Sequence, residues 1–322
     1  MAAPLAPNGL EPESAALVQR LQSGGGEVLD HTDIAQLRLK MAAFMKSCGP
    51  RVLPVKEAAR RTLQVKDREI GSMQYWPINA ADRAGAAPLL VYFHGGGFTH
   101  FSADTHDAVT RYICNRAGCV VVSVDYRLAP EHKFPAALDD AYDAVCWVQA
   151  HAAELGGDPR KIVVAGESAG GTLAAAVCLL AREKGGPGIA LQIPMCASLT
   201  LHDIEKYSSW NALGGGEYLL SKHSIEEIKS LYLQRQKDAL SPFASPLLTP
   251  DCGGLPPALI VTAQFDPLVD EAARYAQRLE QAAVPVTYKC FAGTVHSFMI
   301  MAGIISLGYE ALDFVCARIA EV

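Results

Sequence analysis

Short apolar runs alternate with longer amphipathic segments along most of the chain. A strand buried on both faces forms a brief apolar run between turn residues, whereas a helix repeats its apolar positions every three or four residues. The apolar runs predict strands at 89–93, 120–124, 162–165, 191–195, 258–262 and 286–291. The amphipathic segments predict helices at 105–117, 136–151, 170–184, 271–283 and 309–319. This alternation predicts an α/β fold, with a mostly parallel central sheet and helices on both faces.

The first sixty residues follow a different pattern. Helical spacing at 13–21 and at 33–47 flanks a Gly24-Gly25-Gly26 run, which is expected to break a helix. Strand-like alternation begins only afterwards, at 62–65 and 73–76. We therefore predict two short N-terminal helices ahead of the sheet.

A second interruption separates the last two predicted strands from the others. Residues 199–255 contain no core strand and one amphipathic helix, at 224–234. Because ligand sites in open α/β sheets lie at the carboxyl ends of the strands, this insertion and the N-terminal helices are expected to form a helical cap over the site. The predicted organisation is N-terminal cap helices at 1–60, core at 61–198, a cap insertion at 199–255 and core at 256–322.

Charge excludes some classes of partner. The 34 acidic and 28 basic side chains give a net charge of −6, without a long block of one sign, so no nucleic-acid partner is predicted. No apolar run approaches the length of about 18 residues that crosses a bilayer, and the first residues lack the pattern of a signal peptide. We predict a cytoplasmic protein that does not bind a membrane.

The cysteines and histidines do not form the spacings of a metal site. The nine cysteines are odd in number, scattered and never spaced as C-x-x-C, so most are expected to be reduced core residues. The nine histidines include no pair at helical ligand spacing beside a carboxylate. No metal is predicted.

A glycine-flanked serine follows the strand predicted at 162–165. The segment Gly166-Glu167-Ser168-Ala169-Gly170 joins that strand to a helix of small residues. This context is typical of a nucleophile elbow, a turn so sharp that the positions two before and two after the serine must lack side chains. The turn presents the hydroxyl at a helix N-terminus, where developing negative charge is stabilised. Ser168 is therefore the predicted nucleophile.

A glycine run follows the strand predicted at 89–93. His94-Gly95-Gly96-Gly97 exposes successive backbone amides, and oriented amides stabilise the oxyanion that forms during acyl transfer. We predict an oxyanion hole from this run, with the amides of Gly96 and Gly97 joining that of Ala169. His94 is interpreted as organising the loop.

A serine hydroxyl attacks only when a base takes its proton, and in this fold the order along the chain is serine, acid, histidine. The histidines after Ser168 are His202, His223 and His296. The first two lie in the predicted cap, whereas His296 follows the last strand. We predict His296 as the base, acting first on Ser168 and then on the water that hydrolyses a covalent acyl-enzyme, so that no cofactor is required.

The acid that orients this histidine is expected after the strand at 258–262. Asp266 stands in that loop and is the predicted acid. Asp270 is the alternative, but its position favours a role as N-cap of the next helix.

Five segments in order along residues 89–298 resemble the hormone-sensitive-lipase family of α/β-hydrolase carboxylesterases. They are His94-Gly95-Gly96-Gly97-Phe98, residues 125–131 with 134–137 behind them, residues 166–171, residues 266–270, and His296-Ser297-Phe298. The resemblance implies the triad and oxyanion hole above, a helical cap, and a small-molecule substrate of the short- to medium-chain acyl ester class. It also implies that residues 126–131 support the site, and that a homodimer forms through the strand at 286–291 and the C-terminal helix.

Three residues depart from what the resemblance implies. Glu167 precedes the nucleophile where Asp or Thr is common, and Ser297 follows the histidine where Gly is frequent. Gln264 stands where an acid is often found, which argues against a second carboxylate near His296. These departures leave the predicted triad intact.

Other functions remain open at this stage. The same machinery cleaves amides and thioesters, or acts as a lipase, and a related protein that has lost the histidine binds ligands without turnover; the presence of His296 favours catalysis. The aromatic residues assigned to the substrate pocket are Phe98, Tyr207, Trp210 and Phe298, each with core or lid packing as its alternative.

Overall fold

The computed structural model describes residues 9–23, 33–78 and 85–322. These residues form an eight-stranded sheet of order β1-β2-β4-β3-β5-β6-β7-β8, in which the pairs from β4 to β8 are parallel. The strands are β1 Glu57–Val65, β2 Arg68–Trp76, β3 Ala87–Phe93, β4 Val120–Asp125, β5 Gly157–Glu167, β6 Leu191–Met195, β7 Ala258–Phe265 and β8 Val286–Val295. The predicted α/β fold with a mostly parallel sheet is confirmed. The predicted Gly24-Gly25-Gly26 break lies outside the described residues.

The antiparallel edge of the sheet is longer than predicted. β1 pairs with β2 along all nine of its residues, and β2 continues antiparallel onto β4. Along β1 only Leu63 and Val65 are buried, and charged side chains such as Arg60 and Arg61 fill exposed positions. Because apolar periodicity marks only the buried end of such a strand, the sequence pattern could not reveal its first half.

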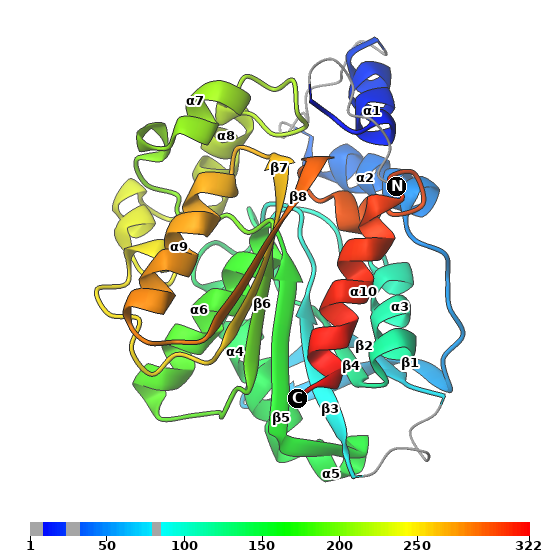
Figure 1. The fold of residues 1–322 in the computed structure, drawn as a ribbon. Coiled ribbons are helices and arrows are strands. Elements are labelled where there is room, and N and C mark those ends of the chain that lie inside the picture. Colours follow the sequence, from blue (N-terminus) through cyan, green and yellow to red (C-terminus); the bar gives the residue numbers. More distant parts are fainter. Residues whose placement is uncertain (1–8, 24–32, 79–84) are drawn as a thin grey trace.

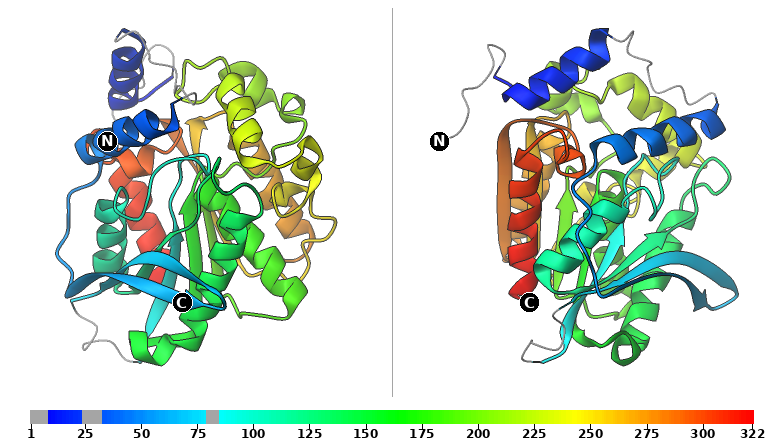
Figure 2. Two further views of the ribbon diagram at one scale, coloured as in Figure 1. Left: turned by 180° about the vertical axis from the view of Figure 1, so that it is seen from behind. Right: turned by 90° about the vertical axis from the view of Figure 1, so that its right-hand side faces the viewer.

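Helices cover both faces of the sheet (Figure 2). One face carries α4 Ala136–Ala150, α6 Ala169–Lys184 and α9 Val269–Gln281. The other carries α3 Asp107–Ala117 and α10 Leu307–Ala320. A single turn, α5 Ala152–Leu155, leads into β5. All five predicted core helices are therefore present, with ends that differ by at most two residues from those predicted.

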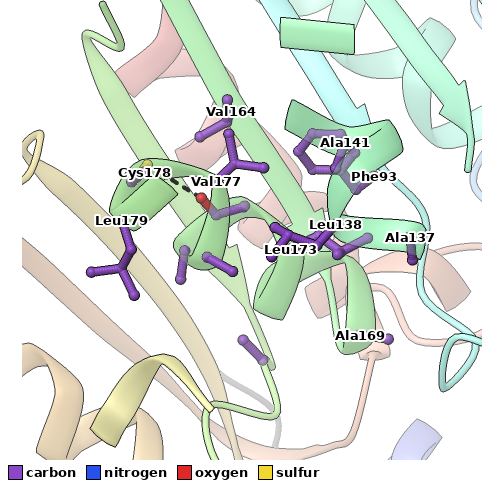
Figure 3. Close-up of a cluster of buried hydrophobic side chains, with 14 of the residues drawn as sticks. Phe93, Ala137, Leu138, Ala141, Val164, Ala169, Leu173, Val177, Cys178 and Leu179 are labelled. Carbon is purple, nitrogen blue, oxygen red and sulfur yellow. Dashed lines mark hydrogen bonds between the residues drawn. The ribbon is translucent and has the colours of Figure 1, made fainter. Parts of the chain in front are cut away.

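Side chains alternate between the two faces of the central strands. Leu89, Val91 and Phe93 of β3 enter one apolar cluster, whereas Leu90 and Tyr92 enter the other. Figure 3 shows the first cluster where α4 and α6 pack over β3 and β5. Small residues predominate along α6, so the helix packs close to the strands and fixes the position of its own N-terminus, which carries Ser168.

Four further helices gather where the parallel strands end (Figure 1). They are α1 Pro12–Ser23 and α2 Ile34–Cys48 from the N-terminal segment, and α7 Ser208–Leu213 and α8 Lys222–Tyr232 from the insertion. The single helix predicted in the insertion corresponds to α8. The prediction missed α7, because a helix of six residues is too short to show a helical period.

Among the described residues, no helix combines the length and apolarity that crossing a membrane requires.

All nine cysteines are free thiols, and seven of them are buried, as expected for core residues.

Candidate active site

The turn after β5 holds Ser168 in an unusual backbone conformation. Ser168 lies between the last residue of β5 and the first residue of α6, and its backbone has a φ of 54° and a ψ of −118°. A Cβ at Gly170 would lie 2.0 Å from the carbonyl oxygen of Phe93, and one at Gly166 would lie 2.3 Å from the backbone of Gly170. Neither position has room for a side chain, which explains the glycine on each side of the serine.

Ser168, His296 and Asp266 come together from the ends of three strands. The hydroxyl of Ser168 lies 3.1 Å from Nε2 of His296, and the opposite ring nitrogen, Nδ1, lies 2.8 Å from Oδ2 of Asp266. β5 ends just before the serine, β7 just before the aspartate and β8 just before the histidine. Residues separated by 128 positions in the sequence therefore form one continuous hydrogen-bonded chain.

Burial and charge act in opposite directions on the imidazole. Burial lowers the pKa of His296, but the charge of Asp266 and its hydrogen bond outweigh this effect and raise the pKa above its ordinary value of 6.5. Asp266 is fully buried, and its second oxygen accepts the backbone N–H of Leu268 at 3.0 Å. The acid is thus held in place by its own loop while it orients the ring.

Asp270 has a role other than the predicted one. Leu268 is the N-cap of α9, so Asp270 lies within the first turn and the N-cap prediction is wrong. Its carboxylate accepts the hydroxyl of Ser208 at 2.6 Å and the backbone N–H of Ser209 at 2.8 Å. The helix begins earlier than predicted because the backbone of Asp266 already accepts the N–H of Val269. Asp270 therefore joins α9 to α7.

The glycine run after β3 forms a tight loop. Gly96 and Gly97 have φ values of 96° and 58°, and the carbonyl of Gly96 accepts the backbone N–H groups of Thr99 and His100. A Cβ at Gly97 would lie 2.7 Å from Ile228 of α8. Both positions need glycine because of their conformation and because of their close contacts.

His94 organises this loop from below, as interpreted from the sequence. Its Nδ1–H donates to the carbonyl of Gly95 at 2.8 Å, and its ring stacks on Tyr126 with a centroid distance of 4.2 Å. Burial, with a smaller contribution from His106, lowers the pKa of His94 to about 4. The ring is therefore neutral at physiological pH.

The segment after β4 supports the same loop. The hydroxyl of Tyr126 donates to the carbonyl of His94 at 2.7 Å, and the N–H of Ala129 donates to the carbonyl of Phe98 at 2.8 Å. Arg127 pairs with the buried Asp140 of α4. These contacts agree with the structural role implied for residues 126–131.

The four aromatic residues predicted to line the pocket lie in different surroundings. Phe98 is buried and stacks on Tyr232 of α8, with ring centroids 3.8 Å apart. Phe298 is fully buried beside Phe291. Trp210 is buried in α7, and Tyr207, the residue before α7, is half-buried. Their role in the pocket stays a prediction.

Several residues near the site were not assigned a role from the sequence. Glu271 of α9 is fully buried and accepts the backbone N–H groups of Leu199 and Thr200 and the indole N–H of Trp210. Glu167 and Ser297 were noted only as departures, yet their side chains are hydrogen-bonded to each other. Gln264, the third departure, accepts the N–H of Gly293 at 2.8 Å. Among these residues, only the unusual residue types at 167, 264 and 297 gave a signal in the sequence.

One group of side chains near the triad has donors that could bind a metal ion. The sulfur of Cys196 lies within 4.8 Å of ligand atoms of Asp266 and His296. Burial raises the pKa of this thiol well above its ordinary value, whereas metal binding needs the thiolate. The Nδ1 of His296 is also engaged by Asp266. These residues fit a hydrogen-bonded triad better than a metal centre.

This geometry defines a class of protein, the α/β hydrolases that place a serine, a histidine and an acid at the carboxyl ends of the strands. A family model described as alpha/beta hydrolase fold matches residues 90–300. The chain is 35% identical to an arylesterase of Saccharolobus solfataricus over 292 residues, 90% of this chain and 92% of that protein. It is 42% identical to the carboxylic ester hydrolase LipN of Mycobacterium tuberculosis over 237 residues, 72% of this chain and 61% of LipN.

A solved structure gives the same result. The ester hydrolase EH1AB1 from the metagenome of Lake Arreo superimposes with a TM-score of 0.91 at 35% identity, covering 97% of this chain and 98% of that one. The chain therefore belongs to the α/β-hydrolase family, among the carboxylesterases of the hormone-sensitive-lipase type. It is an enzyme of the carboxylic ester hydrolase class.

Proposed function

We propose that the protein hydrolyses short- to medium-chain acyl esters with Ser168 as nucleophile, His296 as base and Asp266 as orienting acid. The observation that carries this proposal is the hydrogen-bonded chain from Oγ of Ser168 through the imidazole to the buried carboxylate, with distances of 3.1 and 2.8 Å. Asp266 selects the tautomer whose Nε2 accepts the serine proton, and it stabilises the imidazolium that forms.

The reaction proceeds through an acyl-enzyme. Ser168 attacks the ester carbonyl while His296 takes its proton, and the same histidine returns that proton to the leaving alcohol. Water activated by His296 then releases the acid. Because Ala169 opens α6 next to the nucleophile, its amide joins the dipole of that helix in stabilising the oxyanion.

The second part of the proposed oxyanion hole comes from the loop after β3, residues Gly95, Gly96 and Gly97. The loop is adjacent to the nucleophile turn, since a Cβ at Gly95 would lie 2.0 Å from the carboxylate of Glu167. The positive φ angles of Gly96 and Gly97 and the close contacts of this loop fix their amides in advance, and preorganised donors lower the barrier by several kcal/mol.

The helices over the strand ends support a cap that limits the acyl chain. α8 contacts the loop through Ile228 and Tyr232, and α2 contacts it through Arg38, which donates to the carbonyl of Thr99 at 2.9 Å. A small substrate is consistent with the names of the relatives, an arylesterase and a carboxylic ester hydrolase. The cytoplasmic location and the homodimer inferred from the sequence stay predictions.

The test is hydrolysis of p-nitrophenyl esters from acetate to palmitate by the purified protein, beside Ser168→Ala. A matched control is Ser123→Ala, which alters a buried serine of β4. The proposal expects turnover of the short esters, its loss in Ser168→Ala and its retention in Ser123→Ala. Turnover that survives in Ser168→Ala rejects the triad. A wild-type protein that binds esters without cleaving them would be a receptor.

A further inference from the structure

A buried hydrogen bond joins the residues next to the candidate nucleophile and the candidate base. The hydroxyl of Ser297 donates to Oε1 of Glu167. Ser297 directly follows His296, and Glu167 directly precedes Ser168. Both side chains are buried. The bond therefore connects the end of β5 to the loop after β8, beside the catalytic contact itself.

The second oxygen of this carboxylate faces two other segments. Oε2 of Glu167 lies 3.6 Å from Nε2 of His106, the N-cap of α3, which is fully buried. A Cβ at Gly95 would lie 2.0 Å from the same oxygen, so the backbone of the glycine loop packs directly on the carboxylate. One side chain thus contacts the histidine loop, the oxyanion loop and the start of α3, while its backbone adjoins the nucleophile.

The carboxylate is charged at neutral pH. Burial alone would raise the pKa of Glu167, but His106, His296 and Ser297 together lower it below the ordinary value. The other titratable groups near it are Tyr92, Tyr126, His94 and Cys196. His296 itself faces Asp266, Glu167 and Glu271, and all three carboxyl groups raise its pKa. Glu167 therefore adds a second negative charge that acts on the imidazole, besides that of Asp266.

We propose that Glu167 is a positioning residue for ester hydrolysis. Its side chain holds the histidine loop through Ser297 and the oxyanion loop through Gly95, so that both loops keep their positions relative to Ser168. Its charge also stabilises the imidazolium. This inference rests on the proposed function. The conformation of Ser297 supports it, because a φ of 58° favours glycine, and the serine hydroxyl supplies a bond that glycine cannot.

The first test is Glu167→Gln, which removes the charge and keeps the size. Without that charge the pKa of His296 falls. The acid limb of the pH profile of kcat/KM, where activity is lost as His296 becomes protonated, is therefore expected to move to lower pH. Because the imidazolium is less stabilised and the loops are less constrained, kcat is expected to fall about tenfold with KM little changed. Asp143→Asn, which alters a buried carboxylate of α4 paired with Arg68, is the matched control and is expected to leave the limb in place.

Two further variants separate position from charge. Glu167→Asp keeps the charge but shortens the reach to Ser297, so it should lower kcat while the acid limb stays near its wild-type pH. Ser297→Ala removes the hydroxyl alone and should also lower kcat. Since Glu167→Asp and Ser297→Ala both break the same bond, the double variant Glu167→Asp/Ser297→Ala should be no slower than the worse single variant.

An unmoved acid limb in folded Glu167→Gln, or multiplicative losses in the double variant, would overturn the inference. Thermal melts establish that each variant is folded. If Glu167→Gln does not fold, Glu167→Asp and Ser297→Ala still decide the positioning role, which is rejected if both retain wild-type kcat. Turnover in Ser168→Ala would instead reject the proposed function, so the two failures are distinguishable.

Discussion

The indole N–H of Trp210 donates to Oε1 of Glu271 at 3.1 Å, joining α7 to the first turn of α9. Both side chains are buried, and the second carboxyl oxygen accepts the backbone N–H groups of Leu199 and Thr200. The insertion is therefore fixed to the core at its first residues and again at α7, through one carboxyl group.

Trp210→Phe is expected to destabilise the fold. The change leaves a buried carboxyl oxygen without its partner, which costs about 1 to 3 kcal/mol in the free energy of unfolding. Urea denaturation measures this loss. The matched control is Trp76→Phe, which loses an indole bond to the carbonyl of Leu155 at a half-buried position and should cost less. An equal or larger loss in Trp76→Phe would contradict the anchoring role of Trp210.

Glu271 is expected to make stability depend on pH. Burial raises the pKa of its carboxyl from 4.5 to about 8, so the folded protein binds this proton more tightly than the unfolded chain. Its contribution is complete below about pH 4.5 and is lost as the pH rises from there to about 8. Relative to Glu271→Gln, the wild type should lose on the order of 3 to 4 kcal/mol between pH 5 and pH 8. A difference that is flat across this range would mean that Glu271 is ionised throughout.

The two aspartates after β7 are expected to differ in their effect on catalysis. Asp266→Asn removes the acceptor that selects the His296 tautomer, and kcat should fall by about 10⁴-fold. Asp270→Asn alters only the contact with Ser208 and Ser209 of α7, so it should retain most of the activity. Steady-state kinetics of both variants on one short ester decide the assignment. Comparable losses would show that Asp270 also acts in the reaction.

Arg38 is expected to act through the backbone carbonyls that it holds. It donates to the carbonyls of Thr99 and Ala129 and forms a bidentate pair with Glu131. Arg38→Ala should lower kcat/KM by about tenfold, because α2 no longer restrains the glycine loop. Glu131→Gln removes only an ion pair whose acid is half exposed, and it should change stability by less than about 1 kcal/mol. Equal losses of kcat/KM in the two variants would assign the effect to the ion pair instead.

Sequence reasoning succeeded where the physical signal is local. Apolar runs located the six core strands. The glycines also reflect the shape of their own turns, as in the close approach of Gly166 to Gly170 and the positive φ of Gly96 and Gly97. Chain order and position after a strand led to the prediction of His296 and Asp266. The structure places the two side chains in hydrogen-bonding contact, and their roles in the reaction stay a prediction.

Other features depend on contacts between distant segments. The contact between Asp270 and α7 was missed because its partners, Ser208 and Ser209, lie in a helix too short to show a period. The bond between Glu167 and Ser297 spans 130 positions, and nothing near either residue indicates the other. The exposed half of β1 is stabilised by pairing with β2, which leaves no apolar pattern to detect.

The contact between Ile228 and Gly97 has a further consequence. The side chain from α8 occupies the space where a Cβ at Gly97 would lie, and Phe98 stacks on Tyr232 one helical turn further along. The insertion therefore cannot move independently of the core, because α8 packs directly against the proposed oxyanion loop. Under the proposed function, a change in α8 that made room for a bulkier acyl group would also disturb the proposed oxyanion loop. Substitutions in α8 that change substrate specificity would therefore be limited to those that leave the conformation of this loop intact.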